Sequence, residues 1–221
     1  MAQLFPKMGE IKELKVQLTP GEYQLLYFLN DELDSSYEIY FQPFINGDHP
    51  DIVVMRKGSG IWIIEVKDWD LSAYKVVGEW LWELRNQNGK VKSPVSQALQ
   101  YKNNLFSWHI EGLLEKKIEA PNSFSMIHYS VYFHCAIENE ARQFVKRESR
   151  RDEGYFDIWG RDSLTKEKLQ QLLTHRWLNR TSYYFTEELY HKFVRCLKPS
   201  EHVMEIGKEV SRSGQTCGKC T

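Results

Sequence analysis

The sequence lacks a long apolar segment. Its longest unbroken aliphatic or aromatic run near the middle is Ile61-Trp62-Ile63-Ile64, whereas a helix that crosses a bilayer needs about 20 apolar residues. The mean hydropathy is -0.54. We therefore expect a soluble protein that has no membrane partner.

Features of a secreted protein are also missing. Residues Met1–Glu10 contain no apolar segment of the kind that a secretory signal requires. The four cysteines do not form the dense, evenly spaced framework of a disulfide-stabilised extracellular domain. A location in the reducing cytoplasm fits these observations best.

The chain has almost no net charge. With a formal charge of -1 at pH 7, it has no global positive field that would attract nucleic acid. Any contact with phosphate must then come from a local patch or from a bound metal ion. The strongest local cluster is Lys146, Arg147, Arg150 and Arg151; it is either a solvated loop or helix end, which we favour, or a surface that faces phosphate.

What the chain does have is enough apolar material for one substantial core. Hydrophobic residues make up 42% and aromatic residues 14% of its 221 positions, so a single domain is the simplest expectation. We place this domain at residues 1–210. The stretch 211–221 shows no apolar periodicity, which predicts a flexible C-terminal tail.

Apolar spacing and turn residues predict an alternation of helices and strands. Expected helices cover residues 19–33, 93–117, 164–178 and 186–197. Expected strands cover 37–44, 126–137 and 155–159, together with hairpins at 52–66 and 74–84, while 86–92 is expected to be a loop. This order predicts an α/β or α+β fold in which a mixed central β-sheet is flanked by helices.

The second strand of the first hairpin carries an unusual charged end. Residues 61–66 begin apolar on both faces, which indicates a central, buried strand. Glu65 and Lys67 follow two residues apart and therefore share one face of that strand. A buried acid and base are costly unless they pair or bind something. The two side chains form either a structural ion pair or part of a site.

Asp51 distinguishes the two interpretations because it begins the partner strand. If the hairpin turns about Gly58 through a loop with an odd number of residues, Asp51 lies directly opposite Glu65 on the same face. Gly58 or Gly60 can supply the left-handed backbone that a three-residue loop requires. An even-numbered loop would place Asp51 on the wrong face.

Two carboxylates beside an amine suit a hard cation such as Mg²⁺ or Mn²⁺, with Asp51 and Glu65 as its ligands. Such an ion neutralises a scissile phosphate and lowers the pKa of a bound water. Lys67 would then orient the attacking water or the developing negative charge.

These residues resemble the active site of the PD-(D/E)xK nuclease superfamily. Asp51, preceded by Pro50, corresponds to the first half of that pattern, and Glu65-Val66-Lys67 corresponds to the second half. The wider context is similar to the nuclease-related domain, NERD. That context comprises Gly21-Glu22, the segment Ile64-Glu65-Val66-Lys67-Asp68-Trp69-Asp70, and Ser93-Pro94-Val95-Ser96-Gln97-Ala98.

The resemblance implies a restriction-endonuclease-like mixed sheet and metal-dependent hydrolysis of phosphodiester bonds in DNA. It also implies a possible helicase partner, since NERD domains often precede a superfamily 1 DNA helicase. This chain contains no Gly-x-x-x-x-Gly-Lys-Ser/Thr loop for nucleotide phosphates. A helicase would therefore belong to a longer parent protein or to a separate partner.

The resemblance adds two further site residues. Glu22 corresponds to the helix-borne acid that many superfamily members use as a ligand or water holder. It can equally form a capping box with Thr19 at the start of its helix. Gln97 corresponds to the family's glutamine near the start of the second helix, where it can hydrogen-bond the catalytic lysine or a phosphate, or be an ordinary polar helix residue.

Two rival functions are compatible with the same pattern. The first is a non-catalytic module of this fold that binds nucleic acid or docks a helicase, in which the carboxylates form an ion-pair network. The second is a pure interaction module that uses Trp69, Trp80 and Trp82 as a partner surface. Aromatic side chains on strands are more often core residues than base-stacking ones, so we assign these three, with Tyr74, to the core.

Overall fold

The computed structural model describes residues 1–11, 18–78, 81–85, 89–146 and 156–198. The predicted tail at 211–221 lies outside these residues, as do Arg147, Arg150 and Arg151 of the basic cluster. The extent of the domain, 1–210, stays a prediction.

A six-stranded mixed sheet forms the centre of the molecule, in the order β1-β2-β3-β4-β8-β9. Its strands are β1 (Gln3–Phe5), β2 (Tyr37–Phe41), β3 (Ile52–Arg56), β4 (Gly60–Lys67), β8 (Ile127–Phe133) and β9 (Phe156–Gly160). β2, β3 and β4 pair antiparallel, whereas β1 with β2, β4 with β8 and β8 with β9 pair parallel. The predicted fold class, a mixed central sheet flanked by helices, is confirmed.

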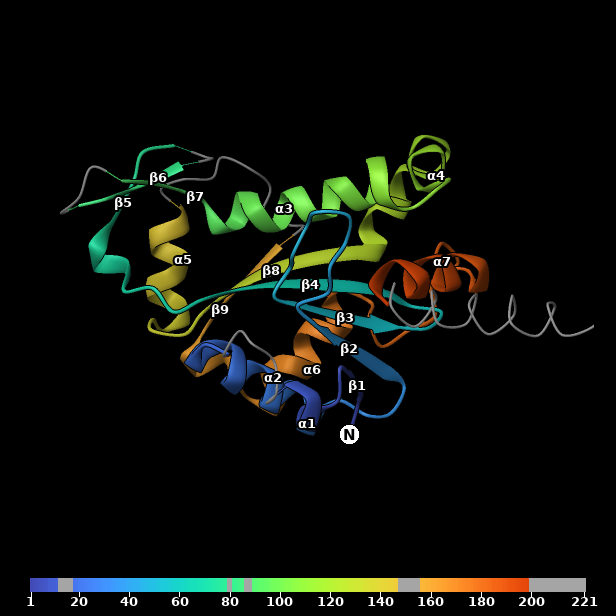
Figure 1. Ribbon diagram of the computed structural model, residues 1–221, viewed down its shortest axis with the longest axis horizontal. Helices are drawn as coiled ribbons and strands as arrows, with labels where there is room; N and C mark the ends of the chain where they lie inside the picture. The colour runs from blue at the N-terminus through green and yellow to red at the C-terminus, as the bar shows by residue number, and fades with distance from the viewer. Residues whose placement is uncertain (12–17, 79–80, 86–88, 147–155, 199–221) are drawn as a thin grey trace, which may run out of the picture.

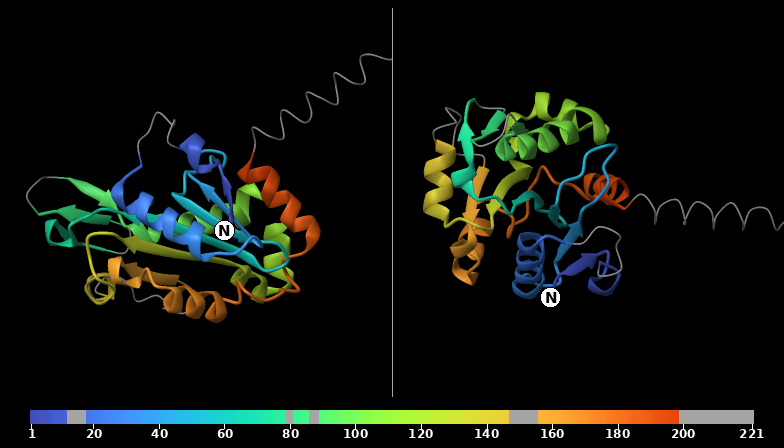
Figure 2. Two further views of the ribbon diagram at one scale, coloured as in Figure 1. Left: turned by 90° about the horizontal axis from the view of Figure 1, so that it is seen from below. Right: turned by 60° about the vertical axis from the view of Figure 1, so that its left-hand side comes forward.

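Helices cover both faces of this sheet. On one face lie α3 (Pro94–Asn104), α4 (Leu113–Glu119), α5 (Glu138–Lys146) and α7 (Glu187–Leu197); the other face carries α1 (Met8–Ile11), α2 (Pro20–Glu32) and α6 (Lys166–His175). Figure 2 shows α2 and α6 over the sheet when the molecule is seen from below.

The alternation of β4 explains why two cores form. Ile61 and Ile63 belong to the core on the α3 side, whereas Trp62 and Ile64 belong to the core on the α2 side. Because successive side chains point to opposite faces, an unbroken apolar run is what a doubly covered strand requires. β4 is therefore the central, buried strand that its sequence predicts.

A second, three-stranded antiparallel sheet follows β4 in the chain. It contains β5 (Tyr74–Val76), β6 (Leu81–Leu84) and β7 (Lys90–Lys92), and is preceded by the short 3₁₀ helix η1 (Leu71–Ala73). The predicted hairpin at 74–84 is confirmed. The predicted loop at 86–92 is wrong at its end, because Lys90–Lys92 pairs with β6 as a third strand.

The helix predicted over 93–117 is interrupted. α3 ends at Asn104 and passes into a π-helical turn, η2 (Leu105–His109), before α4 begins at Leu113. Gly112 adopts φ 78° and starts α4 in a new direction. A left-handed residue cannot continue a right-handed helix, so the break has a local cause.

Other boundaries also differ from the sequence-based expectation. β2 ends at Phe41 instead of residue 44, and β8 ends at Phe133 instead of residue 137. A 3₁₀ segment, η3 (Pro121–Met126), precedes β8, and another, η5 (Arg161–Ser163), follows β9. The helix α5 and the N-terminal elements β1 and α1 were not expected. No helix in the described ranges is both long enough and apolar enough to cross a membrane.

Candidate active site

Glu65 and Lys67 lie where β4 leaves the buried centre of the sheet. The Glu65 side chain is 1% exposed and that of Lys67 is 15% exposed, and their Oε1 and Nζ atoms are 2.5 Å apart. Val66 points to the opposite core, as the alternation of a strand requires. Glu65 and Lys67 therefore form an ion pair, which is one of the two interpretations that the sequence leaves open.

Asp51 approaches this pair from the neighbouring strand. The register joins Ile52 to Ile64 and Arg56 to Gly60, so Lys57, Gly58 and Ser59 form a three-residue loop. Gly58 supplies the left-handed backbone, with φ 70°. One step beyond Ile52 the same register sets Asp51 opposite Glu65, and Asp51 Oδ2 accepts the Val66 N–H at 2.7 Å. The predicted hairpin parity is confirmed.

The electrostatics of the two carboxyl groups are dominated by burial. The pKa of Glu65 is raised to about 8, chiefly by loss of solvation and next by the Asp51 charge, against the opposing effect of Lys67. Burial also raises the pKa of Asp51 to about 6, although the Val66 N–H and Lys67 favour its charged form. One lysine does not compensate two carboxylates in a poorly solvated place, so the cluster favours an additional cation or a proton.

Glu22 forms the capping box, which is one of the two roles that the sequence leaves open, and its role as a ligand stays a prediction. Its Oε2 accepts the Thr19 N–H at 2.7 Å and Thr19 Oγ1 accepts the Glu22 N–H at 3.2 Å, which is the capping box. Its Oε1 accepts from Gln42 Nε2 at 2.8 Å. Glu22 is nevertheless only 5% exposed, and its charge raises the pKa of both Asp51 and Glu65. It lies beside the cluster while both its oxygens are engaged.

Gln97 contacts a tyrosine. Gln97 Nε2 donates to the Tyr101 hydroxyl at 2.8 Å, and this hydroxyl donates to the carbonyl of His49 at 3.2 Å. The His49 carbonyl lies two residues before Asp51, so Tyr101 fixes the backbone that presents the carboxylate. Burial, with the charge of Glu65 next, raises the pKa of Tyr101 above its ordinary value, which keeps it a neutral donor.

The π turn after α3 holds the same segment at a second point. Asn104 Nδ2 donates to Asp48 Oδ2 at 2.8 Å, and His109 Nε2 contacts that same oxygen at 2.9 Å. π turns occur often at functional sites because they redirect side chains within a helix. Sequence reasoning missed Tyr101, Asn104 and His109 as supports of the loop at 42–51, which we call the β2–β3 loop. The spacing of Gln97 and Tyr101 was the only indication available.

A further support joins α2 to the end of β4. Asp68 Oδ1 accepts the Gly21 N–H at 2.8 Å, and His134 Nε2 lies 3.9 Å from that oxygen. A Cβ at position 21 would come within 2.8 Å of Asp68 Oδ1 and 2.9 Å of the His134 Cβ. Glycine is therefore needed before Glu22 so that the helix can approach β4.

The aromatic residues after β4 are mainly structural. Trp82 is fully buried, and Trp69 stacks on Tyr74 with ring centroids 4.5 Å apart. Lys67 Nζ lies 5.3 Å from the Trp69 ring centroid, so this cluster also forms one wall beside the lysine. The assignment of Trp69, Tyr74 and Trp82 to the core is confirmed; Trp80 lies outside the described residues.

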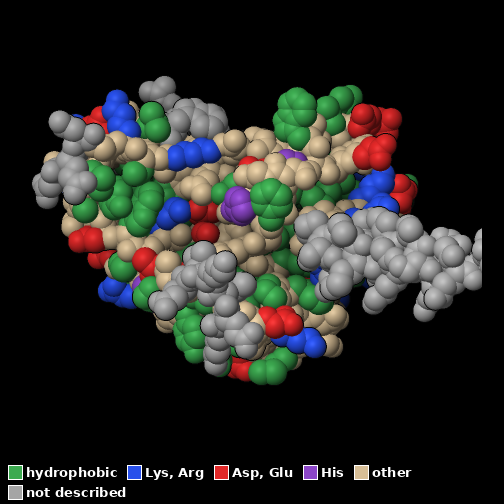
Figure 3. All heavy atoms as spheres, viewed as in Figure 1, with side chains coloured by type: hydrophobic (Ala, Val, Ile, Leu, Met, Phe, Trp, Pro, Cys, Tyr) green, Lys and Arg blue, Asp and Glu red, His purple; other side chains and the backbone are tan. Residues whose placement is uncertain are grey.

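The donor set fits a hard divalent cation at Asp51 and Glu65. Glu65 Oε2 is buried and has no hydrogen-bond partner among the described residues, and such an orphaned oxygen is costly unless something binds it. Carboxylate oxygens are the ligands that Mg²⁺ prefers. Within the described ranges no group of three or more His, Cys, Asp or Glu residues forms a metal cluster, so two carboxylates would carry such an ion. Figure 3 shows acidic, basic and histidine side chains meeting near the middle of this face, over the end of β4.

A mixed sheet between two helical layers, with two carboxylates and a lysine at the end of its central strand, defines a nuclease-type α/β fold. Comparison with known families agrees with this class. The model of the nuclease-related domain, NERD, matches residues 18–134, more than half of the chain, and the protein belongs to this family. No curated protein and no solved structure matches the chain.

Proposed function

We propose that this protein is a metal-dependent nuclease that hydrolyses phosphodiester bonds in DNA. The observation that carries the proposal is the buried Glu65 carboxylate, whose Oε2 has no hydrogen-bond partner in the described part of the chain, directly beside Asp51 and Lys67. Membership of the nuclease-related family supports the same reaction class. A helicase, either fused or separate, is part of the proposal because the family resemblance implies one.

Each residue has a distinct task in this proposal. Asp51 and Glu65 would hold Mg²⁺ or Mn²⁺ between neighbouring strands. When bound, the ion supplies positive charge for the scissile phosphate and a water of lowered pKa. Lys67, whose Nζ lies 2.5 Å from Glu65 Oε1, would orient the attacking water or stabilise the developing negative charge. Tyr101 keeps Asp51 in register through the His49 carbonyl, and Gln97 orients the Tyr101 hydroxyl.

The rival with specific support is a non-catalytic module of the same fold. The short Lys67–Glu65 ion pair supports it, because this contact satisfies one Glu65 oxygen without a metal. The two interpretations differ in the second oxygen, which the ion pair leaves unpartnered in the described structure. They are separated by whether a divalent cation binds and whether DNA is cut.

The deciding experiment compares Glu65→Gln and Lys67→Ala with wild type on labelled single-stranded and duplex DNA. We expect Glu65→Gln to abolish cleavage and the metal-dependent rise in melting temperature, because the amide cannot hold the ion. Lys67→Ala should lower cleavage by about 10²- to 10³-fold, as loss of a transition-state donor does, while retaining metal stabilisation.

The matched control is Glu187→Gln, which removes an exposed carboxylate on α7 whose side chain is 60% exposed. It should cleave like wild type. A cooperative melt must first show that each variant folds, since breaking a buried ion pair can cost about 3–5 kcal/mol. Equal, metal-dependent cleavage by wild type and both folded site variants would contradict the proposal.

A further inference from the structure

A pocket of about 330 Å³ lies beyond the β2–β3 loop, between η2 and α7. Phe44 and Asn46 line it from the loop, His109 and Ile110 from η2 and its end, and Lys192, Arg195 and Cys196 from α7. Asp51, Glu65 and Lys67 are not among its lining residues. The chemistry proposed for Asp51, Glu65 and Lys67 therefore gives this pocket no role.

The pocket and the candidate active site share one short piece of backbone. His109 lines the pocket and contacts Asp48 at 2.9 Å. Asp48 is three residues from Asp51, and three residues span at most about 10 Å. His109 therefore links the pocket to the backbone segment that carries Asp51.

The loop presents two groups that suit a nucleobase. Phe44 is 53% exposed, and its ring lies 4.9 Å from that of His49. Asn46 and Gly47 both have positive φ, 47° and 99°, in a tight turn closed by paired Ile45 and Asp48 hydrogen bonds. This turn presents the Asn46 amide, which both donates and accepts, at an exposed tip. An exposed ring with an adjacent amide can stack on a base and bond to its edge.

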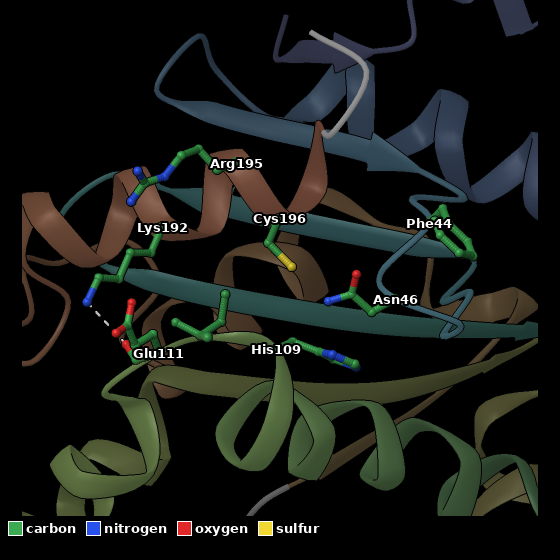
Figure 4. A pocket seen from close by; sticks show the side chains of 8 residues that line it. Phe44, Asn46, His109, Glu111, Lys192, Arg195 and Cys196 are labelled. Atoms are coloured by element: carbon green, nitrogen blue, oxygen red, sulfur yellow. Dashed lines mark hydrogen bonds between the residues drawn. The ribbon is translucent and has the colours of Figure 1, made fainter. Parts of the chain in front are cut away.

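The other end of the pocket carries two cations, Lys192 and Arg195, beside the carboxylate of Glu111. Figure 4 shows the Lys192 and Arg195 side chains at one end and Phe44 and Asn46 at the other, with Cys196 and His109 between them. Lys192 is tethered, because its Nζ donates to the Glu111 carbonyl at 3.1 Å and lies 3.0 Å from Glu188. Arg195 is exposed and makes no ion pair or hydrogen bond with any residue that the structure describes. A guanidinium of this kind suits a phosphate.

We infer that this pocket binds an unpaired nucleotide of the strand whose backbone lies at the Asp51–Glu65 cluster. The inference rests on the proposed function and specifies its substrate: a nucleic acid with a single-stranded segment beside the cleaved bond. A volume of about 330 Å³ is at the small end of the range of about 300–1,000 Å³ for ligand pockets. It accommodates one nucleotide, whereas a base pair still stacked in a double helix cannot enter it.

The test measures binding of a fluorescent oligothymidylate by anisotropy at low salt, with chelator present so that no cleavage occurs. Phe44→Ala and Arg195→Ala should each weaken binding about fivefold or more, as loss of a stacking or phosphate contact does. Phe44→Trp should retain the affinity of wild type. Arg195→Ala should also reduce the salt dependence of binding by about 0.7 in the log–log slope.

Two matched controls lie outside the pocket. Tyr183→Ala removes an aromatic side chain that is 92% exposed, and Lys166→Ala removes an exposed cation at the start of α6, on the opposite face of the sheet. Both should bind like wild type.

The inference is overturned if wild type does not bind the oligomer, or if both pocket variants, shown by melting to be folded, bind it like wild type. Oligomer binding that depends on Phe44 and Arg195 without any metal-dependent cleavage would refute the proposed nuclease and leave the pocket assignment intact. Metal-dependent cleavage by wild type, together with normal oligomer binding by the folded Phe44→Ala and Arg195→Ala variants, would overturn the pocket assignment and leave the proposed nuclease intact.

Discussion

At the scale of single residues, the chemistry depends on one buried oxygen. Glu65 satisfies Oε1 through Lys67, yet Oε2 is orphaned among the described residues. A protein tolerates such an atom where binding compensates its cost, which supports the proposed cation at Glu65. The burial of the Glu65 carboxyl group also determines how it titrates.

The stabilising effect of Mg²⁺ should increase with pH. The pKa values of Asp51 and Glu65 are raised in the folded protein, to about 6 and about 8. Without metal, their contribution to stability is therefore fully present below the unfolded pKa values and is lost as pH rises through the folded ones. The cation binds the deprotonated carboxylates, so protons compete with it at low pH.

Thermal melts with and without millimolar Mg²⁺ would check this dependence. The increase in melting temperature should be small near about pH 5 and large near about pH 9. Glu65→Gln should show little increase at either pH. An increase that is as large in acid as in alkali would mean that the ion binds elsewhere.

At the scale of elements, three segments hold the site by contacts that are distant in sequence. α2 meets the end of β4 through Gly21 and Asp68, while α3 and η2 hold the β2–β3 loop through Tyr101, Asn104 and His109. Each contact uses a side chain to secure backbone or a charged group, so the catalytic candidates are placed by their supports as much as by their own strand.

Gly21→Ala should destabilise the protein by about 1–3 kcal/mol, which is the usual cost of overpacking. Alanine normally stabilises a helix relative to glycine. At position 21, however, its Cβ would lie 2.9 Å from the His134 Cβ and 2.8 Å from Asp68 Oδ1. Gly9→Ala in α1 is the control, because a Cβ at that position meets nothing within 4 Å. Urea denaturation measures both, and a Gly21→Ala protein as stable as wild type would show that α2 does not approach β4 so closely.

Features that depend on residues close together in the sequence can be predicted from it, whereas contacts between residues far apart in the sequence cannot. The β3–β4 register follows from a local turn, because Gly58 supplies the left-handed residue of its three-residue loop. The strand at Lys90–Lys92, by contrast, depends on its pairing with β6. Tyr101 and His49 are separated by 52 positions and Asp68 and Gly21 by 47, and no periodicity reports such contacts. Likewise, the capping box at Glu22 is readable, whereas its closeness to Asp51 is not.

At the scale of the whole molecule, the candidate site lies on the best-protected strand. β4 has hydrogen-bonded neighbours on both sides, β3 and β8, and apolar cores on both faces. Asp51, by contrast, ends the β2–β3 loop, whose middle is an exposed turn at Asn46 and Gly47. The cluster therefore joins a doubly covered strand to a loop that is held by the Gln42–Asp51 backbone hydrogen bond and by side-chain contacts.

Hydrogen exchange should reveal this division. Amides of β4 and β8 should exchange slowest, because opening them requires disruption of both cores, whereas the β2–β3 loop should exchange faster. Divalent cation should slow exchange in that loop more than in β4. Mass spectrometry of peptic peptides resolves these segments; exchange in β4 as fast as in the β5–β7 sheet would contradict the assignment.

The three-residue turn between β3 and β4 also bears on how the gene of such a protein can diverge. Substitutions at Lys57 or Ser59 leave the strand pairing in place, but one codon gained or lost there exchanges the two faces of β3. Its residues Ile52–Met55 are apolar and buried on both sides, so the sheet still offers a suitable pattern to either core. Asp51, however, would then point away from Glu65, and no other carboxylate of this strand would replace it. A lineage can thus keep a foldable sheet and lose its chemistry in one small insertion or deletion, with every catalytic candidate still present in the sequence.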